Sequence, residues 1–176
     1  GRIMILGGGE YTGAPALAAM AAYAAGADVV TVVTPDEVRG VIASFSPNLI
    51  VKGVKELSVR CVEEIADIAA RHHVVVAGMG TENIAELMEE ILKYEVNKAV
   101  LDAGALLSKV PEDIEVILTP HGGEFRRVFA DEPSSENVMK AAKKSGATVL
   151  LKGEKDIISD GERLKVNRSG NAGMTE

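Results

Sequence analysis

The sequence is poor in the residues that mark several large classes of protein. Its 176 residues include no tryptophan, three phenylalanines, three tyrosines and one cysteine. Few aromatic side chains are available for stacking on bases, and a formal charge of −7 opposes binding to a polyanion, so we expect no nucleic-acid partner. The single Cys61 excludes an intrachain disulfide and a metal site built from cysteines, and its apolar neighbours indicate a buried structural thiol.

The sequence also has no apolar run long enough to cross a bilayer, and it shows no signal peptide. We therefore expect a cytoplasmic protein without a membrane partner. Apolar residues make up 47% of the chain and are mostly Ala, Val, Ile and Leu, a composition typical of parallel strands covered by Ala-rich helices. The length fits a single domain over residues 1–176, large enough to bury a core.

Short aliphatic runs alternate with amphipathic segments along the chain. Strands are predicted at residues 3–6, 28–33, 49–51, 74–77, 99–101, 116–118 and 148–151, and helices at 13–25, 36–45, 59–72 (after an N-cap at Ser58), 84–94 and 136–145. Residues 157–159 and 164–166 flank Asp160-Gly161 and predict a hairpin. The alternation predicts an α/β fold, a doubly wound and mainly parallel sheet with helices on both faces.

One loop combines several reactive residue types at the end of a predicted strand. Thr119-Pro120-His121-Gly122-Gly123-Glu124-Phe125 follows the run at 116–118 and opens an amphipathic segment at 125–129. In open α/β sheets, ligands bind at the carboxyl ends of the strands. His121 can donate or accept a hydrogen bond near neutral pH, and Glu124 lies in a first helical turn, where a carboxylate is favoured. The loop is either a ligand site or only a helix cap.

Other strand ends carry residues that phosphate sites use. Gly7-Gly8-Gly9 precedes the helix predicted at 13–25, whose free amides can meet an anion, although the spacing departs from G-x-G-x-x-G and the Walker lysine is missing. The same glycines also suit close packing of that helix. Asp102 can contact substrate or magnesium, or cap the segment at 103–107, and Lys152 is placed to meet a phosphate.

Taken in order, seven segments of the chain resemble the ADP- or ATP-dependent NAD(P)H-hydrate dehydratases of the ribokinase-like superfamily. They cover residues 9–19, 25–27, 78–80, 100–103, 118–124, 151–153 and 170–174, and the blocks at 11–19 and 119–125 are the most specific. The resemblance implies a ribokinase-like fold and repair of NADH and NADPH whose nicotinamide ring has taken up water. Family members phosphorylate the ring hydroxyl from ADP or ATP, with Mg²⁺, and then eliminate phosphate.

The resemblance also implies which residues bind each ligand. Ala14, Gly80 and His121 match the family's contacts to the hydrated dinucleotide, NADHX or NADPHX. The segment that lines the adenine nucleotide corresponds to Lys152, Gly153, Glu154, Lys155 and Asp156. We also expect a homo-oligomer, and many family members carry an epimerase domain ahead of this one.

The sequence departs from the family at four places. After residues 170–175 family members continue into Gly-Gly-Thr-Gly-Asp, whereas this sequence stops at Glu176. We therefore expect the catalytic aspartate to lie beyond Glu176, the domain to be incomplete at its C-terminus, and the 176 residues to be inactive through truncation. Gly104 replaces a usual aspartate, Gly122 replaces a loop proline, and Ala172 replaces another proline.

Two alternatives to a dehydratase remain. A small-molecule kinase of the same superfamily, such as a hydroxyethylthiazole or sugar kinase, would share the fold and the phosphate chemistry. A non-catalytic nucleotide-binding module would fit the missing aspartate. The blocks at 11–19 and 121–124 favour the dehydratase.

Overall fold

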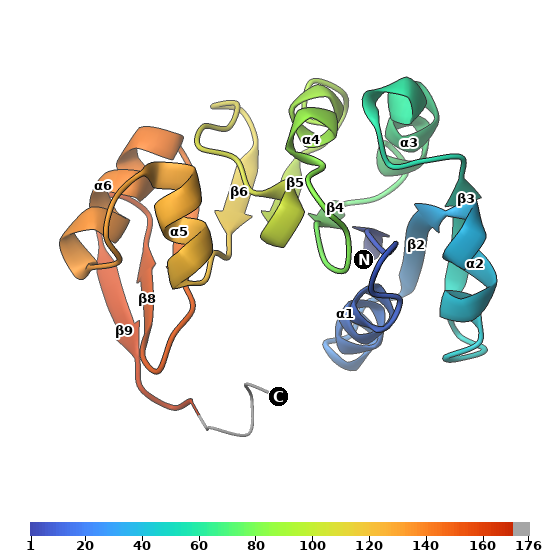
Figure 1. Cartoon of the computed structure of the whole chain (residues 1–176), viewed down its shortest axis with the longest axis horizontal. Coiled ribbons are helices and arrows are strands. Elements are labelled where there is room, and N and C mark those ends of the chain that lie inside the picture. Colours follow the sequence, from blue (N-terminus) through green and yellow to red (C-terminus); the bar gives the residue numbers. More distant parts are fainter. Residues whose placement is uncertain (171–176) are drawn as a thin grey trace.

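A single nine-stranded sheet organises residues 1–170, the part of the chain that the computed structural model describes (Figure 1). Its strand order is β3-β2-β1-β4-β5-β6-β7-β8-β9, with β1 to β7 parallel and β8 and β9 antiparallel. The strands are β1 Arg2–Leu6, β2 Val29–Pro35, β3 Ile50–Val54, β4 Val74–Ala77, β5 Lys98–Leu101, β6 Glu115–Leu118, β7 Thr148–Leu151, β8 Asp156–Ser159 and β9 Leu164–Asn167. The mainly parallel α/β sheet is confirmed.

The helices lie where the amphipathic segments predicted them. They are α1 Gly13–Ala24, α2 Asp36–Ala43, α3 Val62–Ala69, α4 Ala85–Ile91, α5 Gly122–Phe129 and α6 Ser135–Ser145, with short 3-10 turns at Val59–Cys61 and Ala103–Ala105. The helix predicted at 59–72 is therefore split, and Ser58 caps its first turn by accepting a hydrogen bond from the Arg60 amide. Cys61 is half-buried against the core, so it is less buried than expected.

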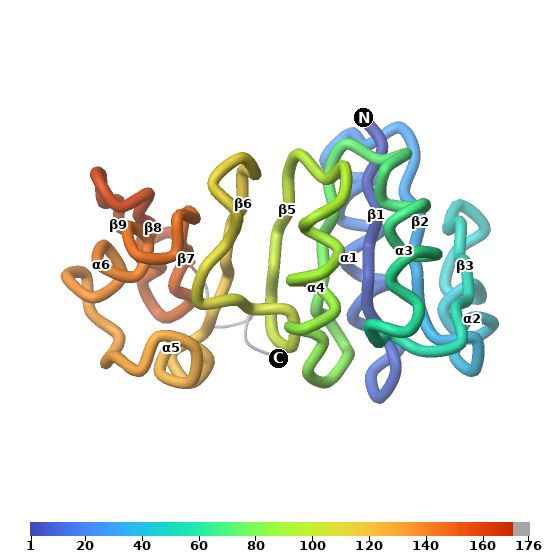
Figure 2. The backbone as a smooth tube through the Cα atoms, turned by 90° about the horizontal axis from the view of Figure 1, so that it is seen from above, coloured from blue at the N-terminus to red at the C-terminus, as the bar shows by residue number. Residues whose placement is uncertain are grey.

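The helices form a layer on each face of the sheet. Side chains of α1 and α2 pack on β1 and β2 around Ile5, Val30 and Ile42. The larger core lies on the opposite face, where α3, α4, α5 and α6 contribute Ile65, Leu87, Phe125 and Val138. Figure 2 shows α3 and α4 in front of the strands on that face. Helices on both faces are thus confirmed.

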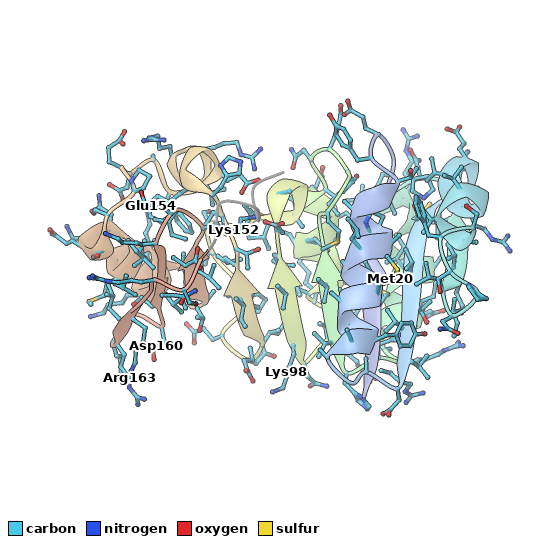
Figure 3. All side chains as sticks on the ribbon, turned by 90° about the horizontal axis from the view of Figure 1, so that it is seen from below. Met20, Lys98, Lys152, Glu154, Asp160 and Arg163 are labelled. Atoms are coloured by element: carbon cyan, nitrogen blue, oxygen red, sulfur yellow. The ribbon has the colours of Figure 1, made fainter. Side chains whose placement is uncertain are left out.

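Coverage of the two faces is unequal within residues 1–170. Val100, Ile117 and Leu150 alternate with core residues of β5, β6 and β7, and they belong to neither hydrophobic cluster. Seen from below in Figure 3, α1 lies in front of the sheet, whereas the strands beside it toward β9 have no helix in front of them. No helix within residues 1–170 has both the length and the apolar character needed to span a membrane.

The predicted hairpin forms in the expected register. Ile157 pairs with Val166 and Ser159 with Leu164. The Asp160 carboxylate accepts hydrogen bonds from the amides of Glu162 and Arg163 at 2.9 and 2.7 Å. These backbone bonds lower the pKa of Asp160 because they favour its charged form.

His72, at the end of the segment that follows α3, is a structural histidine. Its Nδ1–H donates to the Ile68 carbonyl at 2.7 Å, and its Nε2 accepts from the buried Thr31 hydroxyl at 3.0 Å. Burial lowers the pKa of His72 by penalising the charged ring, which outweighs the backbone bond to Ile68.

His72 predicts a loss of stability in mild acid. As the pH drops below the ordinary histidine pKa of about 6.5, His72 becomes protonated in the unfolded chain but stays neutral in the folded chain. The free energy of unfolding therefore falls as the pH drops through that value. The variant His72→Gln should lose this part of the pH dependence. Urea unfolding between about pH 5.5 and 7.5 measures the slope. Equal slopes in the two proteins would contradict a neutral, half-buried His72.

Candidate functional site

The carboxyl ends of the central parallel strands bring the predicted site residues to one edge of the sheet. Five neighbouring strands contribute to this edge. In spatial order, the residues are Gly7-Gly8-Gly9 after β1, Gly78-Met79-Gly80 after β4, Asp102 after β5, His121 after β6 and Lys152 after β7. Figure 3 labels Lys152 at this edge and Lys98, the first residue of β5, at the opposite one. Residues from five strands therefore face the same side of the fold, as the sequence predicted for a ligand site.

Ala14 and Gly80 lie against each other. The Tyr11 amide donates to the Gly80 carbonyl at 3.3 Å, and Gly80 has a φ of +71°. A Cβ on Gly80 would overlap the Tyr11 carbonyl oxygen and lie 3.3 Å from the Cβ of Ala14. This position therefore needs glycine, because the loop before α1 touches the turn after β4 through backbone atoms.

His121 is the N-cap of α5. Its Nδ1 accepts from the amides of Gly123 and Glu124 at 3.0 and 3.3 Å, and the Glu124 carboxylate accepts from the His121 amide at 2.8 Å. The loop therefore caps α5, with a histidine in the place that serine or threonine usually takes. Because Nδ1 accepts, a neutral ring carries its proton on Nε2, and the side chain remains 59% exposed. The cap fixes the ring, and Nε2 lies 3.4 Å from Oε1 of Glu124.

Lys152 joins three strand ends. Its amide donates to the Pro120 carbonyl at 2.8 Å, which forms a parallel bridge with His121. Its ammonium donates to Oδ1 of Asp102 at 2.7 Å, so the pair spans the ends of β5 and β7 across β6. Asp102 makes no capping hydrogen bond to the turn that follows it, which excludes that alternative. Sequence reasoning considered the two residues separately and missed their pairing.

The rest of the predicted nucleotide segment connects β7 to β8. Asp156 is the first residue of β8, and its carboxylate accepts from the Gly153 amide at 3.2 Å and from Asn167 Nδ2 at 3.1 Å. Glu154 and Lys155 are exposed beside Gly153. Asp156 therefore shapes the connection, while the segment between it and Lys152 presents backbone and charged side chains to solvent.

The turn after Asp102 is tightly confined. Ala103 has a φ of +46°, unusual for a residue with a side chain, and its carbonyl accepts from Nη2 of Arg127 at 3.0 Å. A Cβ on Gly78 would overlap the Asp102 carbonyl oxygen, and the Cβ of any side chain at residue 104 would overlap the Glu82 carbonyl oxygen. Position 104 therefore has no room for a side chain, because the neighbouring backbone fills the space.

A cavity of about 550 Å³ lies beside these turns. It is lined by Gly8, Gly9, Glu10, Pro35, Glu37, Lys55, Glu56, Leu57, Thr81, Glu82, Asn83 and Ile84. The cavity therefore adjoins the glycine turns after β1 and β4, but Ala14, Gly80 and His121 are not among its lining residues. The motif at 170–174 falls almost wholly on residues 171–176, outside the described part of the chain.

Residues 1–170 contain no group of three or more His, Cys, Asp or Glu side chains placed to hold a metal ion. Asp102 is paired with Lys152, and Glu124 accepts from the His121 amide. These residues do not fit a preformed magnesium site. Magnesium at phosphate sites is commonly bound by substrate phosphates together with one or two carboxylates. This edge by itself would therefore offer few ligands for the ion.

Comparison with known proteins gives one consistent family. The family model described as NAD(P)H-hydrate dehydratase matches residues 3–176. The bifunctional NAD(P)H-hydrate repair enzyme Nnr of Archaeoglobus fulgidus is 56% identical over 99% of this chain, and the ADP-dependent (S)-NAD(P)H-hydrate dehydratase of Cenarchaeum symbiosum is 32% identical over 99%. The chain spans 38% of the first protein and 67% of the second.

A solved structure shares the fold. It is the ADP/ATP-dependent NAD(P)H-hydrate dehydratase from Bacillus subtilis co-crystallised with ATP/Mg²⁺, which is 22% identical and superposes with a TM-score of 0.82. The match covers 99% of this chain and 66% of the solved chain. At this identity the likeness shows a common ribokinase-like architecture.

Gly78 offers a test of the confined turn. Gly78→Ala should lower the free energy of unfolding by about 1–3 kcal/mol or more, because its φ is +110° and the new Cβ would meet the Asp102 carbonyl. Gly40→Ala is the matched control: that helical glycine has open space around it, so alanine there should stabilise by about 0.5–1 kcal/mol. Urea denaturation compares the three proteins, and a harmless Gly78→Ala would disprove the close packing.

The His121 cap gives a second test. His121→Ala should lower the free energy of unfolding by about 0.5–2 kcal/mol, because two amides at the start of α5 lose their acceptor. His121→Ser should retain most of the stability, because serine is a favoured N-cap. Thermal and urea unfolding measure both variants. If alanine were as stable as serine, the ring nitrogen would not be the cap.

Proposed function

The chain belongs to the NAD(P)H-hydrate dehydratase family, and we propose that it serves the nucleotide-dependent dehydration of hydrated NADH and NADPH, a metabolite-repair reaction. The observation that carries this proposal is the family match, which extends over residues 3–176 and so includes every strand end described above. The site supports it because the residues expected to bind the two ligands are neighbours along one edge of the sheet.

We assign the hydrated dinucleotide to the side of the edge formed by Ala14, Gly80 and His121. Gly80 has no side chain and Ala14 only a methyl group, and the backbone contact between Gly80 and Tyr11 holds their two turns together, which allows close approach of a large ligand. The cap fixes the exposed ring of His121, and its Nε2–H, 3.4 Å from Oε1 of Glu124, can turn its bond to the hydroxyl that distinguishes the hydrated ring from the normal one.

We assign the adenine nucleotide, ADP or ATP, to Lys152, Gly153, Glu154, Lys155 and Asp156. The Lys152 ammonium lies at the edge near His121, where it can attract a phosphate, and Asp156 holds the backbone of the segment in shape. A bound Mg²⁺ stays a prediction, since residues 1–170 offer no preformed site for it. A fused epimerase domain and a homo-oligomer also stay predictions.

In the proposed reaction, the ring hydroxyl loses its proton and its oxygen bonds to the terminal phosphorus of the nucleotide. The bond from that phosphorus to the bridging oxygen breaks, and AMP leaves when ADP is the donor or ADP when ATP is the donor. The phosphate then leaves with the electrons of the carbon–oxygen bond, and loss of a ring proton restores the double bond. Residues 1–170 contribute binding and orientation, and we assign none of them as the catalytic base. Phosphoryl transfer depends mainly on such positioning and on charge stabilisation, which makes the arrangement at the strand ends decisive.

Calorimetric titration of the 176-residue chain with hydrated NADPH and with NADPH tests the proposal. Hydrated NADPH should bind about 3- to 10-fold more tightly, because its hydroxyl gains one hydrogen bond from His121. His121→Ser keeps the helix cap but cannot reach the ring, so it should abolish the preference. His73→Ala is the matched control, because that histidine accepts from the Arg2 amide at the start of β1, at the opposite edge.

Equal affinity of the wild-type chain for the two dinucleotides would contradict the proposed substrate. A preference that survives in His121→Ser would contradict the role of His121 alone. Separate titrations with ADP and ATP test the nucleotide site. Binding of both ligands without turnover, in a longer protein that contains this chain, would select the non-catalytic module instead.

A further inference from the structure

The ion pair between Asp102 and Lys152 is placed where it can control a ligand more than it can stabilise the fold. The two side chains are 28% and 40% exposed, and pairs this open to water contribute little to folding. Their atoms are nevertheless 2.7 Å apart, although the residues are 50 positions apart in sequence. A long lysine side chain at an open edge would otherwise sample many rotamers.

Asp102 is itself held more firmly than a strand-end aspartate needs to be. The next residue, Ala103, has the left-handed φ of +46°, a conformation that residues with a side chain rarely adopt. It is maintained by the bond from Arg127 and by the backbone contact with Gly78. Backbone strain that the surroundings maintain is concentrated at functional sites, and here it sits beside a charged group at the ligand edge.

We propose that Asp102 is a positioning residue that holds the Lys152 ammonium ready for the phosphates of the bound adenine nucleotide. This inference rests on the proposed function, which assigns the nucleotide to the Lys152 segment. An ammonium group has three N–H donors, so one bond to Asp102 leaves two for phosphate oxygens. The carboxylate thus fixes the rotamer of the lysine without using up its capacity to bind an anion.

A positioning role and a simple charge effect predict opposite results. As a bare negative charge near the phosphates, Asp102 would repel the nucleotide, and its removal would tighten binding. As a positioning residue, its removal would free the lysine side chain, which then has to be ordered when the nucleotide binds. Removing the carboxylate therefore distinguishes the two roles: nucleotide affinity falls if Asp102 positions the lysine and rises if Asp102 acts only as a negative charge.

The test is a double-mutant cycle on ADP affinity, measured by calorimetry with the 176-residue chain. Asp102→Asn should weaken ADP binding about 3- to 10-fold, and Lys152→Met about 10-fold or more. When Asp102→Asn is already present, Lys152→Met should lower ADP affinity by less than about 3-fold, because a lysine that is no longer fixed contributes less to binding. Asp113→Asn, an exposed aspartate in the turn before β6, is the matched control and should leave ADP affinity unchanged.

Ala103→Gly provides a variant that keeps both charges. Glycine adopts the left-handed conformation freely, so the fold should not be strained by the change, yet the turn that aims Asp102 becomes looser. ADP affinity should fall about 2- to 3-fold while the melting temperature stays within a few degrees of wild type. Unchanged affinity in this variant would overturn the claim that the turn fixes Asp102.

Tighter or unchanged ADP binding in Asp102→Asn would overturn the positioning role, and so would an equal cost of Lys152→Met in both backgrounds. These results differ from a failure of the proposed function. If the wild-type chain bound no ADP, the nucleotide site itself would be wrong, and the inference would fall with it. If the wild-type chain bound ADP but the two substitutions acted independently, only the inference would fail.

Discussion

The candidate site depends on backbone-to-backbone packing between the turns that follow β1, β4 and β5. Gly80 contacts the Tyr11 carbonyl before α1, Gly78 contacts the Asp102 carbonyl after β5, and Gly104 contacts the Glu82 carbonyl. Side chains at these positions would force the three turns apart. Because the N-terminus of α1 and the carboxylate of Asp102 are both set by these contacts, a shift of one turn would move groups assigned to both ligands. The glycines therefore contribute to the site by allowing the turns to pack closely, and they need not contact a ligand themselves.

The sheet order then converts distant sequence positions into neighbours. Asp102, His121 and Lys152 end three adjacent parallel strands, so about 4.8 Å separates each strand from the next. The Pro120 carbonyl ties the β7 end to the β6 end, and the Asp102–Lys152 pair ties β7 to β5. His121 and Glu124 complete the arrangement by capping α5 reciprocally. Each of these polar groups thus has a structural partner, and Lys152 Nζ keeps donors beyond its bond to Asp102.

Local patterns predicted most of the fold, because they are set by neighbouring residues. The hairpin register followed from Asp160-Gly161 and the alternation on either side, and the strand ends followed from aliphatic runs that stop at polar or glycine residues. Pairing across β6 could not be predicted in the same way, because it depends on strand order and on a lysine rotamer. The left-handed Ala103 was also hidden, since alanine gives no local signal for that conformation. The motif at 170–174 extends outside the described residues, so its part in the site stays a prediction.

The charge of the chain places a constraint on any ligand that carries phosphates. With a formal charge of −7, the long-range field of these 176 residues repels an anion, so recognition has to come from groups within hydrogen-bonding distance. Free amides at helix N-termini, the Nε2–H of His121 and the Lys152 ammonium are groups of this kind. Short-range donors strengthen binding most when they already point at the ligand. A donor on a disordered side chain has to be ordered on binding, and the entropy cost of ordering offsets its hydrogen bond. An acidic protein that binds a nucleotide therefore gains more from a fixed lysine than a basic protein would, and this is why a carboxylate can belong in an anion site.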